Sequence, residues 1–248
     1  MRVPCEWLLP LVALIAAGDS AAFAPPPRRV HLWAWERQED LRFLEGLDVG
    51  VAFLATTLRL EASRVVEFPR RQPLRVAVET PLTAVVRIEA DPKAPLDESQ
   101  RSHVIGRIVA AAKTPGVRRL QVDFDASRSQ RHAYACLLRE LRPSLPPGMP
   151  LSMTALASWC MFDRWIDEAR LPVDEVVPMV FAMGRGGADL RNRLASEGDF
   201  RAHACRNAVG FATWESAHDV PPGRSVYWFH DEPWTATSFR HALAKVPP

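Results

Sequence analysis

The chain alternates between short, nearly unbroken apolar runs and longer stretches in which apolar residues recur every three or four positions. Short apolar runs are typical of strands covered on both faces, and the recurring spacing is typical of amphipathic helices. The apolar runs predict eight strands, at residues 30–35, 49–55, 84–89, 120–125, 151–157, 175–181, 207–213 and 226–229.

The segments between these strands mostly carry a helical pattern. Asp97 followed by Gln100 forms a capping-box sequence ahead of an apolar stripe at positions 104–112. Further helices are predicted at 36–47, 134–141, 162–169, around Leu190 and Leu194, and at 237–244. After the second strand the rhythm changes, because residues 58–61 and 64–68 flank Ala62-Ser63 and predict a β-hairpin. The whole pattern predicts an α/β fold, a (β/α)8 TIM-type barrel in which a hairpin replaces the second crossover helix.

The N-terminus has the organisation of a secretory signal peptide. Arg2 precedes an apolar run from Trp7 to Ala17, and Ala22-Phe23-Ala24 is a small-x-small cleavage site. We therefore expect a signal peptide at 1–24, a proline-rich leader at 25–29 and a single barrel domain at 30–248. The predicted localisation is exported, either periplasmic or extracellular. The run is short for a bilayer span, so an uncleaved anchor is the minor alternative, and no stable membrane span is expected after cleavage.

Charge and cysteine content exclude several classes of function. The chain has 31 basic and 29 acidic residues; without residues 1–24, which hold Arg2, Glu6 and Asp19, 30 basic and 27 acidic remain. This balance gives no reason to expect a nucleic-acid partner. Cys136, Cys160 and Cys205 are widely spaced, which is compatible with one disulfide of open pairing and with no zinc site. No metal and no cofactor are expected, and the sequence carries no signal for an oligomeric state.

The strongest chemical signal is the sequence Leu120-Gln-Val-Asp-Phe-Asp125. Side chains alternate along a strand, so Asp123 and Asp125 point the same way. Two carboxylates on one face repel each other, and a chain tolerates this where a barrel strand opens into a polar site at its carboxyl end. The alternative is structural, in which Asp125 or Ser127 caps the following helix.

Other predicted strands also end in acids or tryptophans. Carboxylates can cleave a glycosidic bond and aromatic faces can stack on sugar rings, so this combination favours a glycan ligand. Asp125 with Glu215, or Asp125 with Glu36, would provide the two carboxyls that flank a scissile bond. The candidate catalytic residues are Asp125, Asp123, Glu215 and Glu36, and the candidate substrate-binding residues are Trp35, Trp159, Trp214, Trp234, Arg185 and Glu89.

Four segments carry a resemblance to a known family. They are His31-Leu-Trp-Ala-Trp-Glu-Arg37, Gln121-Val-Asp-Phe-Asp125, Leu151 to Cys160 and Pro178-Met179. Together they resemble a family of exported bacterial proteins known as domain of unknown function 3142. The resemblance extends over nearly all of the chain after residue 24 and implies a barrel, but no activity.

A more distant resemblance is to chitinase-like glycoside hydrolases, whose fourth strand ends Asp-x-Asp-x-Glu. The matching positions here are Gln121, Asp123 and Asp125, so the first acid is absent and the last is one methylene shorter. Their sixth-strand Met-x-Tyr-Asp corresponds to Met179-Val-Phe181-Ala182, which lacks both polar groups. These departures argue against a substrate-assisted mechanism. The leading hypothesis is an exported glycoside-hydrolase-like barrel acting on an envelope or environmental glycan or another polar envelope ligand. The alternative is a non-catalytic barrel that binds a glycan or a protein.

Overall fold

The computed structural model describes residues 30–62, 64–91, 96–215 and 223–245. The predicted signal peptide and leader, residues 1–29, lie outside the described residues. Within the described part of the chain, no helix has both the length and the apolar character needed to cross a membrane.

Eight parallel strands close into a barrel, as the sequence predicts. In spatial order they are β1 (Val30–Ala34), β3 (Val49–Glu61), β6 (Leu82–Ala90), β7 (Val117–Phe124), β8 (Leu151–Leu156), β9 (Glu175–Met179), β10 (Ala208–Ala212) and β11 (Ser225–Phe229). β1 pairs in parallel with both β3 and β11, and this double pairing closes the sheet. All eight carboxyl ends therefore face the same rim.

The predicted hairpin is confirmed. β4 (Arg64–Pro69) runs antiparallel to the long end of β3, with Thr57 opposite Phe68. The chain then forms β5 (Leu74–Arg75) and returns to the barrel at β6.

The predicted helix at 36–47 is wrong. This segment forms β2 (Glu39–Asp40) and a short 3-10 helix, η1 (Arg42–Leu44), instead. The backbone N–H groups of Glu39 and Leu41 donate to the carbonyls of Pro73 and Arg75 at 3.0 and 2.7 Å. The hairpin excursion thus supplies the hydrogen bonds that a helix would have made internally.

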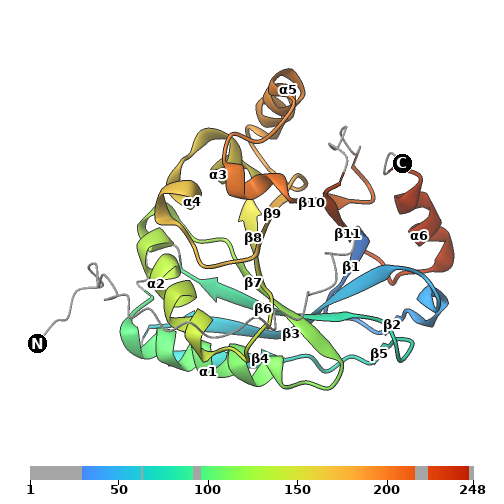
Figure 1. Cartoon of the computed structure of the whole chain (residues 1–248), viewed down its shortest axis with the longest axis horizontal. Coiled ribbons are helices and arrows are strands. Elements are labelled where there is room, and N and C mark those ends of the chain that lie inside the picture. Colours follow the sequence, from blue (N-terminus) through green and yellow to red (C-terminus); the bar gives the residue numbers. More distant parts are fainter. Residues whose placement is uncertain (1–29, 63, 92–95, 216–222, 246–248) are drawn as a thin grey trace, which may run out of the picture.

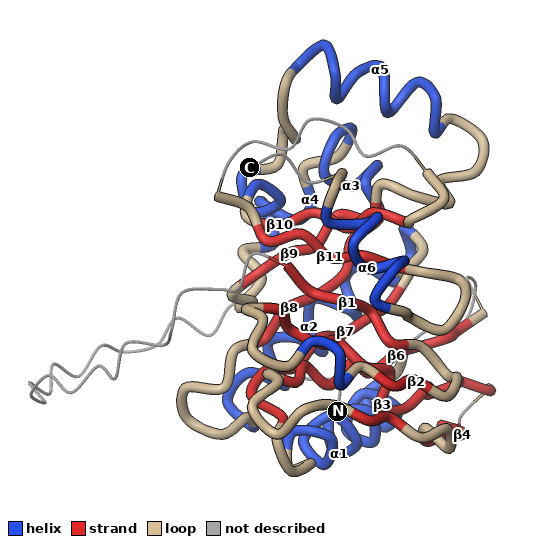
Figure 2. The backbone as a smooth tube through the Cα atoms, turned by 90° about the vertical axis from the view of Figure 1, so that its right-hand side faces the viewer, coloured by secondary structure: helices blue, strands red, loops and turns tan. Residues whose placement is uncertain are grey.

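The helices surround the strands (Figure 1). α1 (Glu98–Ala112) begins at the predicted Asp97–Gln100 capping box. The remaining helical elements are η2 (Arg128–Gln130), α2 (Arg131–Leu141), η3 (Arg142–Ser144), α3 (Ala157–Phe162), α4 (Trp165–Ala169), α5 (Gly187–Glu197), η4 (His203–Arg206) and α6 (Ala236–Leu243). The predicted helix at 162–169 is in fact two, because the Asp163 carboxylate accepts from the Arg164 and Trp165 N–H groups and caps the second. α5 lies apart from the strands, beyond α3 (Figure 2).

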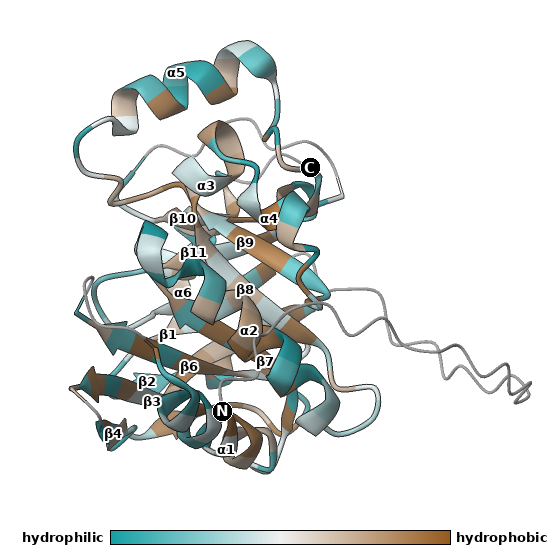
Figure 3. Cartoon of the chain, turned by 90° about the vertical axis from the view of Figure 1, so that its left-hand side faces the viewer, coloured by the Kyte–Doolittle hydropathy of each residue, from teal (hydrophilic) through white to brown (hydrophobic). Residues whose placement is uncertain are grey.

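Two apolar layers hold the barrel together. The larger lies between the strands and the surrounding helices, and the central strands are accordingly brown in Figure 3 while α5 is mainly teal. The smaller layer fills the barrel interior around Trp33 and Tyr227. Gly210 makes room for Trp33, because a Cβ at this position would lie 2.6 Å from the indole ring. The filled interior leaves the rim as the place for a site.

One disulfide links two segments outside the barrel. Cys160 of α3 bonds to Cys205 of η4, and Cys136 is buried and is not part of this disulfide. The Ala202 N–H also donates to the Cys160 carbonyl at 3.0 Å. The disulfide and this hydrogen bond fix α3, which follows β8 at the rim, against the segment that precedes β10.

Candidate functional site

Asp123 is the last inward-facing residue of β7 and is fully engaged by its neighbours. Its side chain is buried, with 3% of the residue exposed. The Arg87 guanidinium of β6 pairs with one carboxylate oxygen at 3.0 Å, and the Thr154 hydroxyl of β8 donates to the other at 2.7 Å. Arg87 lies directly opposite Asp123 in the β6–β7 register. Asp123 is therefore held by partners on both flanking strands.

Asp125 follows β7 and differs sharply from Asp123. Its side chain reaches solvent, and within the described residues no group donates a hydrogen bond to its carboxylate. The surrounding protein still removes enough water from this carboxyl to raise its pKa to about 6, with the charge of Asp123 adding to the rise and Arg87 opposing it. The helix-capping role falls to Ser127, which forms a capping box with Gln130. Asp125 thus stands at the rim as a carboxyl that holds its proton unusually well.

Asp125 opens into a cavity of about 480 Å³ at the carboxyl rim. The cavity lies between the ends of β6 to β9, helix α3 and the start of α5. Its lining residues are Arg87, Asp125, Leu156, Ala157, Ser158, Phe162, Met179, Phe181, Ala182, Met183, Arg185, Gly186, Gly187 and Leu190. The polar side chains among them are an acid, two arginines and a serine on a largely apolar wall. This composition is typical of a small-molecule or oligomer binding site.

Aromatic rings extend the rim beside this cavity. Phe181 stacks on Phe229 at 5.7 Å between ring centroids, and Trp214 meets both rings edge to face. Trp35 approaches Phe229 from another side at 5.7 Å, again edge to face. Trp214 is 49% exposed, so it presents a ring face to solvent. Trp214 is therefore placed where a sugar ring could stack, whereas Trp35 is half-buried and the Arg87 guanidinium lies over its ring at 5.9 Å.

Phe181 and Phe229 are not among the site residues that the sequence predicts. Both lie on the inward-facing positions at the ends of predicted strands. That alternation could have identified them.

Two of the predicted stacking tryptophans are not surface residues. Trp159 and Trp234 are each 3% exposed. Trp159 packs edge to face on Trp165 at 5.3 Å, and the Trp234 indole N–H donates to the Trp33 carbonyl at 2.9 Å. Both rings are therefore packed in the interior of this structure, and neither presents a free face at the rim.

The remaining predicted acids lie outside the cavity lining, and each has partners of its own. Glu215 accepts from the Ala182 N–H at 2.9 Å and pairs with Arg191 at 3.2 Å. Glu36 accepts from the backbone N–H groups of Arg71 and Gln72 at 2.9 and 3.3 Å. Glu89 pairs with Arg59 and Arg87. The structure thus brings Asp125 and Arg185 of the predicted set into one cavity, and it places these three glutamates around it as loop and strand anchors.

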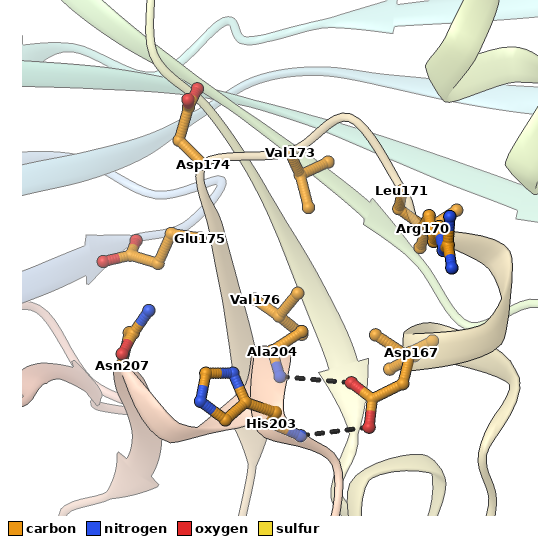
Figure 4. Close-up of a pocket in the computed structure, with 11 residues that line it drawn as sticks. Asp167, Arg170, Leu171, Val173, Asp174, Glu175, Val176, His203, Ala204 and Asn207 are labelled. Carbon is orange, nitrogen blue, oxygen red and sulfur yellow. Dashed lines mark hydrogen bonds between the residues drawn. The ribbon is translucent and has the colours of Figure 1, made fainter.

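A second cavity, of about 390 Å³, lies at the opposite end of the barrel, where β9 and β10 begin (Figure 4). Its carboxylates, those of Asp167, Asp174 and Glu175, already have structural partners. The Asp167 carboxylate accepts from the N–H groups of His203 and Ala204 at 3.1 and 3.2 Å, as Figure 4 shows. Glu175 pairs with Arg119 at 2.8 Å and accepts from the Tyr227 hydroxyl at 2.7 Å. These contacts close the amino end of the barrel, where residues generally serve stability.

No group of three or more His, Cys, Asp or Glu side chains in the described residues is arranged to hold a metal ion.

Comparison with known proteins supports the fold and the family resemblance. Residues 78–185 match the family described as "Domain of unknown function (DUF3142)", and this segment includes Arg87, both acids of β7, Ser158 and Arg185. The crystal structure of the Bacillus cereus spore cortex-lytic enzyme SleL is similar, with a TM-score of 0.51 and 15% sequence identity. The similarity covers 88% of this chain and 58% of SleL, so the chain spans less than two thirds of that protein. A search of curated protein sequences finds no match.

Proposed function

We propose that this protein is a glycan-acting barrel in which Asp125 donates a proton to the glycosidic oxygen. The observation that carries the proposal is the position of Asp125, an acid with a pKa raised to about 6 in a rim cavity next to exposed aromatic rings. A general acid must be protonated near the working pH, and a carboxyl with this pKa meets that condition in mildly acidic surroundings. The shared fold with SleL, a spore cortex-lytic enzyme, is compatible with a polymeric envelope substrate.

The identity of the nucleophile depends on which other carboxyls lie in the cavity. Among the described residues, Asp125 is the one carboxyl that lines the cavity. Asp123 is buried and bound to Arg87 and Thr154, so it sets the electrostatics of Asp125 and does not attack the sugar. The usual arrangement of two carboxyls across the scissile bond is therefore not formed. In this proposal water attacks the sugar as the bond to the protonated glycosidic oxygen breaks, and the proton that this water loses goes to bulk solvent.

The ion pairs of the other rim acids favour a second candidate function, a barrel that binds a glycan without cleaving it. Glu215 and Glu89 are both paired with arginines. An inactive relative of an enzyme would keep its aromatic surface and cavity, while its rim acids would form ion pairs that stabilise the fold. Turnover separates the two candidates.

The test uses purified protein and Asp125→Asn, which keeps the shape of the side chain and removes its titrating group. Wild type and variant are incubated with a panel of envelope and plant polysaccharides, and released reducing ends are measured. We expect turnover to fall by about 10²–10⁴-fold in the variant, the usual contribution of a general acid, while binding in affinity electrophoresis is unchanged.

Asp231→Asn is the matched control, because Asp231 is an exposed acid at the same rim outside the cavity lining. Wild-type binding without turnover would favour the non-catalytic barrel. Full turnover in a folded Asp125→Asn protein would remove Asp125 from the mechanism.

A further inference from the structure

Arg185 differs from the other arginines near the rim cavity. It lies in the glycine-rich loop between β9 and α5 and lines the cavity. Among the described residues, no carboxylate pairs with it. Its neighbours are compensated: Arg191 pairs with Glu215 at 3.2 Å, and Arg131 pairs with Asp163. The cavity therefore contains one cation whose charge is not balanced by the protein.

The other charged groups of the cavity do not neutralise the charge of Arg185. Arg87, the second arginine of the lining, already pairs with Asp123 at 3.0 Å and with Glu89 at 3.3 Å. Asp125 is the remaining acid, and it resists ionisation because burial and Asp123 both raise its pKa. The cavity is consequently positive wherever Asp125 is protonated. Arg185 is exposed, so a ligand that enters the cavity can reach its guanidinium.

We propose that the cavity selects an acidic glycan, and that Arg185 binds a sugar carboxylate. This inference rests on the proposed function, because it assigns the substrate class of the same site. A guanidinium presents a planar fork of N–H donors that matches a carboxylate with two parallel hydrogen bonds. The Ser158 hydroxyl on the neighbouring wall can donate to the same sugar. A negative charge bound here also disfavours ionisation of Asp125, so a carboxylated sugar would keep the proton donor loaded.

The experiment compares glycans that differ in charge within one backbone type. Wild-type protein is run in affinity electrophoresis through gels that contain polygalacturonate or its methyl ester, and carboxymethylcellulose or hydroxyethylcellulose. We expect retardation by at least one acidic member and at least tenfold weaker retardation by its neutral counterpart. Adding free glucuronate should compete with the acidic polymer, whereas adding glucose should not.

Three variants assign the preference to Arg185. Arg185→Gln should weaken binding to the acidic polymer about tenfold and leave binding to the neutral polymer unchanged, and Arg185→Lys should recover part of the loss. Arg118→Gln is the control, because Arg118 is exposed near the amino end of β7 and its loss changes net charge equally. Equal effects of Arg185→Gln and Arg118→Gln would show a general charge attraction and overturn the inference.

The outcomes also separate this inference from the function on which it rests. Binding to neutral and acidic members with equal strength would contradict the selection of an acidic glycan and leave a glycan-binding barrel intact. Failure of the wild type to bind any polymer of the charged and neutral set, or of the wider polysaccharide panel, would contradict both. Both would be supported if the wild type cleaves an acidic polymer and Arg185→Gln raises the KM of this reaction while leaving kcat nearly unchanged.

Discussion

Two identical side chains on β7 acquire opposite roles because of their neighbours. Asp123 lies within the barrel, where Arg87 and Thr154 hold its two carboxylate oxygens. Asp125 lies two positions further on, past the last hydrogen-bond donors that the strands provide. The surrounding protein removes water from its carboxyl, and the charge of Asp123 adds to this effect, so the pKa of Asp125 rises to about 6. The chemistry of the rim depends on this asymmetry.

The raised pKa of Asp125 predicts how stability depends on pH. The folded protein holds the Asp125 proton up to about pH 6, whereas an unfolded aspartate releases it near pH ~4. Between these values the folded state binds more protons than the unfolded state, so this group lowers stability as pH rises from 4 to 6 and its effect is constant above that range. Asp125→Asn cannot ionise. We expect its Tm to equal that of the wild type at pH 4 and to exceed it at pH 7.5, measured by thermal denaturation.

A Tm difference between Asp125→Asn and wild type that is the same at both pH values would contradict the raised pKa. A gain in stability on loss of the acid, together with a loss of turnover, is the pattern expected of a functional group that is kept at a cost in stability.

The hydrogen bond from Thr154 to Asp123 predicts how substitutions of Thr154 change stability. Its hydroxyl donates to the buried Asp123 carboxylate at 2.7 Å. Thr154→Val keeps the shape of the side chain but leaves that oxygen without its donor, which costs about 1–3 kcal/mol in the free energy of unfolding. Thr154→Ser keeps the hydroxyl and should cost clearly less. Urea denaturation of both variants measures the difference, and equal losses would show that methyl packing, not the hydrogen bond, is responsible.

The residue scale also shows how far the sequence could predict the site. Strand alternation correctly brought Asp123 and Asp125 to one face, because that property is local to the backbone. It could not show that Trp159 and Trp234 are buried, since this depends on tertiary contacts, with Trp165 of the next helix and with the distant Trp33 of β1. Likewise, the partners of Glu215 come from the loop after β9 and from α5, so its ion pair was not predictable from the strand end on which it lies.

At the scale of elements, the barrel strands were predictable and the first crossover was not. Each barrel strand is an apolar run whose burial is dictated by its position between two layers. The segment 36–47 has apolar residues at helical spacing, but its backbone pairs with the excursion at β5. The buried Glu39 carboxylate accepts from Arg37 at 2.7 Å and from the Trp234 N–H at 2.8 Å. A long-range partner therefore overrode the local pattern.

The disulfide between α3 and η4 predicts a large, specific loss of stability. The bond joins residues 45 positions apart, and a loop of this length corresponds to about 4 kcal/mol in the chain-entropy model. We expect the Cys160→Ala/Cys205→Ala double variant to lose about 2–5 kcal/mol in urea denaturation. Cys136→Ala, which removes the buried thiol outside the disulfide, should lose less. Because α3 carries Ser158 and Phe162 of the cavity wall, the double variant should also bind glycan more weakly, and unchanged binding would show that α3 is held by packing alone.

At the scale of the whole molecule, the two ends of the barrel have different roles: one stabilises the fold and the other carries the candidate site. The amino end is closed by the contacts of Glu175 with Arg119 and Tyr227, and the interior above it is filled by Trp33 and its neighbours. The carboxyl rim is left open, with a cavity and exposed aromatic rings. This division between a stable base and a variable rim is how (β/α)8 barrels accommodate different chemistries.

The N-terminal sequence and the disulfide together predict the compartment in which the molecule works. The sequence at 1–24 has the order of a signal peptide, and the disulfide requires an oxidising compartment to form and persist. We therefore expect export with cleavage after Ala24, so that the mature chain begins at Pro25. Intact mass spectrometry of protein recovered from the envelope or medium, with and without reduction, measures both features at once.

The reduction step should add two hydrogen masses, and alkylation of the unreduced, unfolded protein should label Cys136 alone. The matched control is the chain from Pro25 expressed in a reducing cytoplasm, which should yield three alkylatable cysteines. An uncleaved chain starting at Met1 and found in the cytoplasm with all its thiols free would contradict export. Such a chain would also lack the Cys160–Cys205 disulfide, which helps to fix α3 at the cavity wall. Export therefore bears on the binding site as well as on localisation.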